Sequence, residues 1–156
     1  MKLIAVGLNH KTAPIEVREK LAAKLNDLDT VYEELKHITS EAALLSTCNR
    51  VELYAVPKGN SPNAILEWMY SNSKSGSQKS EGHLYIHNEK SALQHLFRVI
   101  ASLDSMIIGE DQIVAQVKAA YRHANKAEST GPILQRVLER AFTVAKKVRN
   151  ETSISQ

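Results

Sequence analysis

The chain has 156 residues, of which 43% are hydrophobic and 24% are charged, and its formal net charge is +3. This composition is typical of a folded globular domain and argues against a disordered chain. A single cysteine cannot form an internal disulfide, which argues against a secreted, cross-linked fold. The N-terminal apolar run, Leu3–Val6, is too short for a signal peptide or a membrane span. We therefore expect a cytoplasmic protein of one compact domain, with or without an appended helical layer.

The first half of the sequence predicts alternating strands and helices. Apolar, β-rich runs predict strands over 2–8, 41–47, 51–56 and 83–87. Helical spacing and helix start signals predict helices over 14–22, 27–38 and 63–70, the first two forming one crossover. Residues 71–82 form a polar connection. The order strand, helix, strand, strand, helix, strand is the split β-α-β pattern of the ferredoxin-like fold.

Only helices are expected after residue 88. Their predicted apolar faces are Leu93, Leu96, Phe97 and Ile100; then Ile113, Val117, Ala120 and Tyr121; then Ile133, Leu134, Val137, Leu138, Ala141, Phe142 and Ala145. The sequence therefore predicts an α+β fold, with a ferredoxin-like part over 1–88 and a helical part over 89–156.

Positive charge gathers in the helical part. Residues 113–150 contain eight Lys/Arg and two acids, Glu128 and Glu139. Such a segment favours a polyanionic partner, for which tRNA is one candidate, although a solvated helix face would look the same.

The only cysteine, Cys48, lies between two predicted strands in "LLSTCNRVELYAV", residues 44–56. A thiol reacts as its thiolate, and the nearby cation Arg50 would favour that form. A tight turn, in which Asn49 could adopt the left-handed conformation, would keep the sulfur accessible. The local residues leave two interpretations open, a packed structural cysteine and a nucleophile.

Two further polar sets could belong to a site. His95 falls on the side of its helix opposite the predicted apolar face, where it could line a cleft and exchange protons or be exposed without a role. Glu110, Gln112 and Gln116 surround a predicted helix start after Gly109. Groups there could hold a polar or anionic substrate or simply cap the helix.

Metal and nucleotide sites are not expected in this chain. His83 and His87 are four residues apart, which in a strand separates them by about 13 Å. One cysteine provides no zinc set, and the sequence contains no glycine-rich nucleotide motif. Any nucleotide cofactor would have to be held elsewhere.

Four segments together resemble the glutamyl-tRNA reductase family, whose members begin the five-carbon route to tetrapyrroles. They are "GLNHKTAPIEVREK" at 7–20, "LSTCNRVELY" at 45–54, "HLFRVIASLDSMIIGEDQIVAQVK" at 95–118 and "AFTVAKKVRNET" at 141–152. The resemblance covers nearly the whole chain and implies the N-terminal catalytic domain. It also implies that NADPH is bound by a Rossmann domain outside this chain, and that the full-length enzyme is a homodimer.

The resemblance implies a mechanism. The Cys48 thiolate would attack glutamyl-tRNA(Glu), and NADPH would reduce the resulting thioester to glutamate-1-semialdehyde for porphyrin and haem biosynthesis. His95 falls at the family's activity-critical histidine, which would polarise the ester or protonate the leaving ribose oxygen. The implied substrate-binding residues are Thr47, Asn49, Arg50, Ser105, Glu110, Asp111, Gln112 and Gln116. Arg50 is the expected partner of a substrate carboxylate, and Asp111 stands where the family frequently has proline.

The resemblance carries two further expectations. Glutamate-1-semialdehyde aminomutase is a candidate protein partner. Without the NADPH domain, the fragment should acylate and act as an esterase, but should not reduce its substrate.

A non-catalytic RNA-binding module is the alternative function. A ferredoxin-like sheet can stack RNA bases on surface aromatics, and Tyr54 and Tyr85 are the strand candidates here. The whole chain is only 5% aromatic, which disfavours this hypothesis. A redox-sensing thiol at Cys48 is a third hypothesis.

Overall fold

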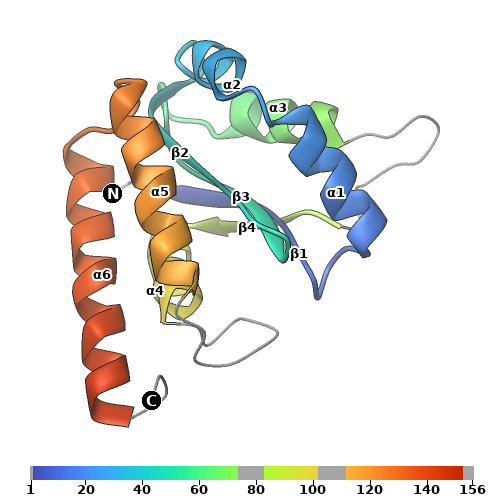
Figure 1. The fold of residues 1–156 in the computed structure, drawn as a ribbon. Helices are drawn as coiled ribbons and strands as arrows, with labels where there is room; N and C mark the ends of the chain where they lie inside the picture. Colours follow the sequence, from blue (N-terminus) through green and yellow to red (C-terminus); the bar gives the residue numbers. More distant parts are fainter. Residues whose placement is uncertain (1, 74–82, 102–111, 153–156) are drawn as a thin grey trace.

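The computed structural model describes residues 2–73, 83–101 and 112–152 (Figure 1). The strands are β1 (Ile4–Asn9), β2 (Thr39–Ser46), β3 (Arg50–Pro57) and β4 (Tyr85–Asn88). The helices are α1 (Ile15–Lys24), α2 (Leu28–Leu35), α3 (Asn63–Ser73), α4 (Lys90–Ile100), α5 (Gln112–Lys126) and α6 (Pro132–Thr152). The predicted connection over 71–82 begins inside α3, and its remainder, 74–82, lies outside the described residues.

The four strands form one antiparallel sheet in the order β2-β3-β1-β4. β1 lies between β3 and β4, which is the strand arrangement of a split β-α-β motif. This arrangement confirms the predicted α+β, ferredoxin-like fold. The fourth strand begins two residues later than predicted, at Tyr85.

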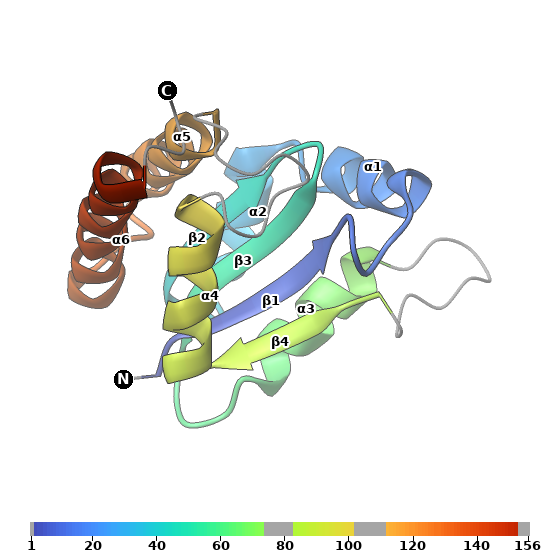
Figure 2. The same cartoon turned by 90° about the horizontal axis from the view of Figure 1, so that it is seen from below.

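Helices cover both faces of the sheet. α1, α2 and α3 lie on one face, and α4, α5 and α6 lie on the other (Figure 2). On the second face, Tyr54 of β3 and Leu45 of β2 line one small apolar space together with Leu96, Val117 and Leu138 of the three helices. The sheet is therefore the middle layer of the molecule, and its second face is packed against protein.

The helical layer is fixed to the sheet at the edge strand β2. Ser129, just after α5, accepts a hydrogen bond from the Ala42 backbone N–H, and its hydroxyl donates to the Ala42 carbonyl oxygen, both at 2.8 Å. The Glu41 carboxylate accepts from the backbone N–H groups of Ile133, at 3.2 Å, and Leu134, at 2.7 Å. A carboxylate at a helix start satisfies free N–H groups and complements the helix dipole, so β2 directs where α6 begins.

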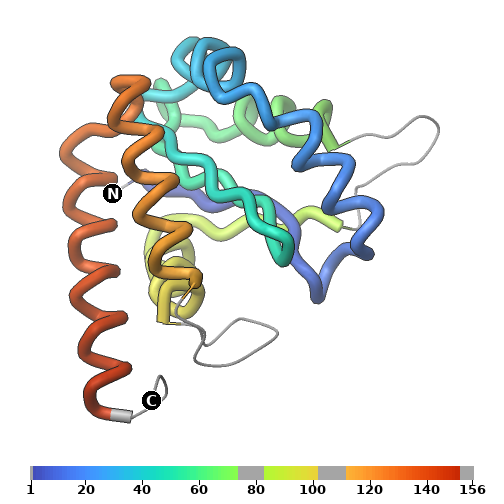
Figure 3. The backbone as a smooth tube through the Cα atoms, in the orientation of Figure 1, coloured from blue at the N-terminus to red at the C-terminus, as the bar shows by residue number. Residues whose placement is uncertain are grey.

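α5 and α6 then run side by side past the β2 edge (Figure 3). No helix within the described ranges is long and apolar enough to cross a membrane.

Candidate functional site

Cys48 lies in the short turn between β2 and β3, and its side chain is exposed. The Thr47 N–H donates to the Arg50 carbonyl oxygen at 2.8 Å. The Thr47 hydroxyl accepts from the backbone N–H groups of Asn49, at 3.1 Å, and Arg50, at 3.2 Å. Thr47 therefore holds the turn. The predicted tight turn is present, but Asn49 does not adopt the left-handed conformation that it could have taken there, because the only described non-glycine residues with positive φ are Glu89 and Glu128.

A buried carboxylate, Glu52, lies two residues beyond Arg50 on the same face of β3. Its side chain has no exposed surface, and its Oε1 lies 3.5 Å from an Arg50 guanidinium nitrogen. The Tyr54 hydroxyl donates to Oε1 at 3.0 Å. Tyr85 of β4 and His95 Nε2 of α4 both hydrogen-bond to Oε2. We call Arg50, Glu52, Tyr54, Tyr85 and His95 the Glu52 network.

Gly7 provides the space in which this network assembles. It is paired with Glu52 on one side and with Tyr85 on the other, so all three face the same side of the sheet. A Cβ atom at Gly7 would lie 2.2 Å from the Val51 carbonyl oxygen and 2.8 Å from the Glu52 Cα. Because Gly7 carries no side chain, the Tyr85 hydroxyl reaches across β1 to Glu52.

The network keeps Glu52 ionised. Burial by itself would raise the pKa of this carboxyl, but hydrogen bonds from His95 and Tyr85 and the Arg50 charge outweigh it and hold the pKa below its usual range. The pKa of Tyr54 is raised well above its ordinary value, first by burial and then by the Glu52 charge. Tyr54 is therefore a neutral donor to an anionic Glu52.

The predicted placement of His95 on the side of its helix opposite the buried face is wrong. Its side chain is 10% exposed, and the buried face of α4 consists of Ala92, His95, Leu96, Val99 and Ile100. Leu93 and Phe97, placed on the apolar face by the sequence, are only partly buried. The histidine joins the buried face because Glu52 satisfies its Nε2 there.

His95 also lies against other rings. It stacks on His87 of β4, with ring centroids 4.4 Å apart, and it contacts the Tyr85 ring at 5.3 Å. These contacts fix the plane of the His95 imidazole. Because an ionised carboxylate can only accept, the Glu52 contact assigns the proton to Nε2 and leaves Nδ1 as the basic nitrogen.

The remaining predicted site residues are only partly placed. Gln112 is exposed in the first turn of α5, and Gln116 is half-buried one turn later. Val117, next to Gln116, packs against the β2 residue Leu45. The other three predicted residues lie outside the described residues; they are Ser105, Glu110 and Asp111.

The structure thus links Arg50 to His95 through Glu52, which sequence reasoning did not select. Tyr85 was considered only as an RNA-stacking residue, and Gly7 only as part of a motif. The available signal was the alternation of Arg50, Glu52 and Tyr54, which places three polar side chains on one face of an otherwise apolar strand. Tyr54 is 3% exposed and bonded to Glu52, so it offers no platform for RNA bases.

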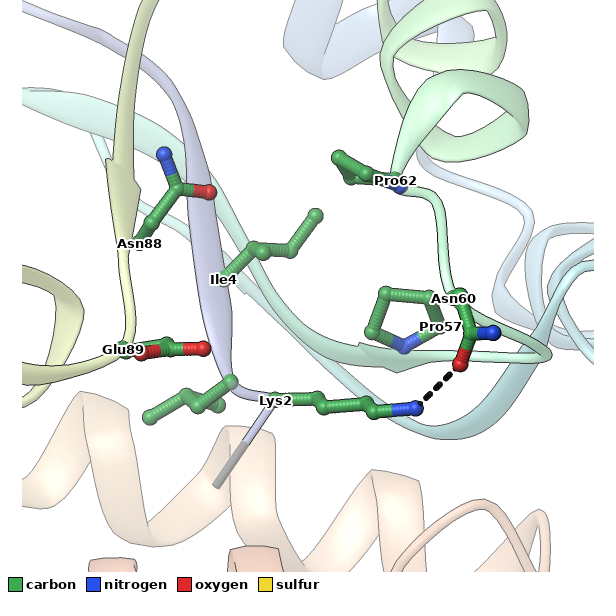
Figure 4. Close-up of a pocket in the computed structure, with 8 residues that line it drawn as sticks. Lys2, Ile4, Pro57, Asn60, Pro62, Asn88 and Glu89 are labelled. Atoms are coloured by element: carbon green, nitrogen blue, oxygen red, sulfur yellow. Dashed lines mark hydrogen bonds between the residues drawn. The ribbon is translucent and has the colours of Figure 1, made fainter.

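A separate cavity of about 240 Å³ lies at the other end of the sheet (Figure 4). Lys2 donates to the Asn60 side-chain oxygen across its rim at 2.7 Å. Its walls come from the start of β1 and the ends of β3 and β4, and none of the predicted site residues lines it. Among the described residues, no group of three or more His, Cys, Asp or Glu could hold a metal ion.

The sequence matches the family described as "Glutamyl-tRNAGlu reductase, N-terminal domain" over residues 6–152. Glutamyl-tRNA reductase of Syntrophotalea carbinolica is 44% identical over 161 residues, covering 100% of this chain and 36% of that protein. The Marinobacter nauticus protein of the same name is 40% identical over 158 residues, covering 100% of this chain and 37% of its own length.

Among solved structures, glutamyl-tRNA reductase from Methanopyrus kandleri matches with a TM-score of 0.76 and 31% identity. This match covers 99% of this chain and 36% of that one.

These similarities identify the class of protein: the chain is an α+β domain of the kind found at the N-terminus of longer reductases. It belongs to the glutamyl-tRNA reductase family, as the N-terminal domain. It spans little more than a third of the length of the curated relatives it matches, 36% and 37% in the two described above.

Proposed function

We propose that this chain accepts the glutamyl group of glutamyl-tRNA on Cys48 as a thioester. The observation that carries the proposal is the position of the exposed Cys48, in a turn whose next strand begins with Arg50 and leads through Glu52 to His95. The family membership supplies the substrate class. An exposed thiol in a turn is accessible to a substrate ester, as a nucleophilic cysteine must be.

The proposed reaction is an acyl transfer. The Cys48 thiolate attacks the ester carbonyl carbon, so that a sulfur–carbon bond forms and the ester carbon–oxygen bond breaks. The electron pair of that bond leaves with the terminal ribose oxygen of the tRNA, which takes up one proton. No electrons are exchanged, and the products are a glutamyl thioester and free tRNA.

His95 is the proposed source of that proton. Its Nε2 is held by Glu52, so Nδ1 is the nitrogen that would take the thiol proton, relayed by water from the exposed turn, and return it to the ribose oxygen. The negative charge on Glu52 would stabilise the imidazolium that forms in between, as a carboxylate does in hydrolase triads. Tyr54 and Tyr85 hold the carboxylate in place for this role.

Arg50, two residues after Cys48 in the chain, is the proposed partner of the substrate carboxylate. Its guanidinium is 1% exposed and lies 3.5 Å from Glu52. A fixed positive charge next to the turn would favour an anionic substrate. In this proposal, Thr47 and Asn49 shape the turn, and Gln112 and Gln116 contribute amide groups from α5.

The hydride donor of this family, NADPH, is not matched by the residues described here. Of the three described glycines, Gly7 faces Glu52 and Gly131 faces the Glu41 carboxylate. Gly59 has open space around it but stands alone after β3, so these glycines form no glycine-rich phosphate loop. The chain's proposed part therefore ends at the thioester. Reduction to glutamate-1-semialdehyde, dimerisation and transfer of the product to an aminomutase are proposed for the full-length protein.

Single-turnover acylation tests the proposal. Labelled glutamyl-tRNA is mixed with the parent chain, with Cys48→Ser, and with Ser46→Ala, an exposed control two residues before Cys48. We expect a labelled, hydroxylamine-sensitive adduct on the parent and the control, and at least a hundredfold slower acylation of Cys48→Ser. If Cys48→Ser is labelled and hydrolyses the ester as fast as the parent, the assignment is wrong.

A further inference from the structure

A row of basic side chains runs along the exposed side of α5. Lys118, Arg122 and Lys126 are each four residues apart and all exposed, and the helix contains no acidic residue. Four residues correspond to slightly more than one helical turn, so neighbouring members of the row stand about 6 Å apart along the axis. We call these three residues the α5 basic row.

The positive charges of the row are not paired within the described part of the chain, where no carboxylate lies within ion-pair distance of its three members. The Lys118 ammonium instead lies 5.8 Å from the centroid of the Phe142 ring of α6. Phe142 also contacts Tyr121, so the two helices are packed together at the row, and exposed Lys146 follows Phe142 by one turn on α6.

The direction of α5 relates the row to the proposed acyl-accepting turn. The far end of the helix is fixed near the middle of β2, where Ser129 bonds Ala42. Val117, near the other end, lines the same apolar space as Leu45, close to the end of β2. α5 therefore runs antiparallel to β2. The row starts on the side of the Cys48 turn and leads about 12 Å away from it.

We propose that the α5 basic row binds backbone phosphates of the tRNA acceptor arm. This inference rests on the proposed function, because the 3′ end must reach Cys48 to react. The rest of the acceptor arm must then leave the turn along the surface of the domain, and the α5 basic row follows one such path. Regularly spaced cations contact successive phosphates and position an RNA without reading its sequence.

α6 offers a matched control surface. Arg136, Arg140 and Lys147 are also exposed. They lie about 120–160° around the α6 axis from Phe142, away from the α5 basic row. Removing these three residues changes the net charge by the same amount as removing the row.

The test compares two triple variants, Lys118→Ala with Arg122→Ala and Lys126→Ala, and Arg136→Ala with Arg140→Ala and Lys147→Ala. Affinity for tRNA is measured by fluorescence anisotropy over a series of salt concentrations. We expect the row variant to bind about 10- to 100-fold more weakly at low salt, with a salt slope shallower by about 2 to 3. The control variant should stay within about threefold of the parent. Equal losses in the two variants, or no loss in the row variant, would overturn the proposal.

A second measurement separates this inference from the proposed function. The small ester 3′-O-glutamyl-adenosine lacks the acceptor-arm phosphates, so the row variant should acylate Cys48 from it at the parent's rate. Slower acylation would indicate damage to the turn and would count against a docking role. If neither substrate labels Cys48 in any variant, the acyl-transfer proposal fails. The binding comparison still tests whether the α5 basic row binds tRNA. If the row variant loses binding to anionic lipid vesicles but binds tRNA as the parent does, the proposal is overturned, and the row binds a membrane surface instead of RNA.

Discussion

Glu52 is a fully buried anion, and its environment explains why it can remain one. An isolated carboxylate in a protein interior is strongly disfavoured, but this one faces Arg50 and receives hydrogen bonds from Tyr54, Tyr85 and His95. The partners come from two strands and one helix. Removing the charge on Glu52 would take away the carboxylate that lies 3.5 Å from the Arg50 guanidinium, which is 1% exposed.

The first prediction concerns Glu52→Gln. We expect the free energy of unfolding at neutral pH to fall by about 3 kcal/mol, because the substitution removes the negative member of a buried ion pair and hydrogen-bond network. The folded-state pKa of Glu52 is lowered, so its contribution is present above the usual glutamate pKa and is lost as the pH falls towards the folded-state value. Urea unfolding between pH 7 and pH 3 should therefore show a flatter pH dependence for Glu52→Gln than for the parent.

Glu67→Gln is the matched control for that measurement. Glu67 is exposed on α3 and belongs to no buried network among the described residues. Its removal should leave both the stability and its pH dependence near those of the parent. A loss of stability in Glu52→Gln no larger than in Glu67→Gln would show that the carboxylate is not balanced as described.

The Glu52 network also marks a limit of what the sequence could predict. Cys48, Arg50 and His95 were selectable by residue type and by family resemblance. The partner that joins Arg50 to His95 was not, because Glu52 and His95 are separated by 43 residues and meet only after α4 crosses the sheet. His95 was assigned to the exposed face because a histidine counts as polar in a helical pattern, whereas Ala92 and Val99 complete the real buried stripe.

At the scale of elements, α6 begins where a distant strand supplies its cap. Glu41 of β2 accepts from the Ile133 and Leu134 N–H groups, 92 and 93 residues further along the chain. Gly131 allows this approach, since a Cβ there would lie 2.8 Å from the Glu41 carboxyl carbon. The succession of strands and helices in the sequence predicted the ferredoxin-like fold correctly. It could not predict that β2 caps the helix, because that contact is purely tertiary.

The corresponding prediction is for Glu41→Gln. Replacing the carboxylate with an amide removes a charge-assisted acceptor at the helix start, which should cost about 1 kcal/mol. Amide exchange at Ile133 and Leu134 should become faster, while exchange in the middle of α6 changes little. Glu139→Gln, exposed on the same helix, is the control. Unchanged exchange at Ile133 and Leu134 in Glu41→Gln would mean that the cap does not stabilise the helix start.

At the scale of the whole molecule, the sheet joins two helical layers into one core. One connected cluster of buried side chains includes Leu21 of α1, Met69 of α3, Leu53 of β3 and Leu138 of α6. The division of the sequence into 1–88 and 89–156 follows the change from strands to helices. It does not divide the core, because α4, α5 and α6 cover the second face of the sheet.

This shared core predicts that the two layers unfold together. Leu138→Ala removes a side chain that is 4% exposed in α6, which should cost about 2–5 kcal/mol. Trp68 lies in α3 on the opposite face of the sheet, bonded to Glu34 of α2 at 2.8 Å, so its fluorescence reports on the other layer. If the molecule is one cooperative unit, Leu138→Ala lowers the urea midpoint of Trp68 fluorescence as much as that of the far-ultraviolet circular dichroism. Gln135→Ala, exposed on α6, should move neither midpoint. If only the circular-dichroism midpoint shifts, the helical layer unfolds separately from the rest of the molecule. The sheet would then stay folded without α4, the helix that supplies His95 to the Glu52 network.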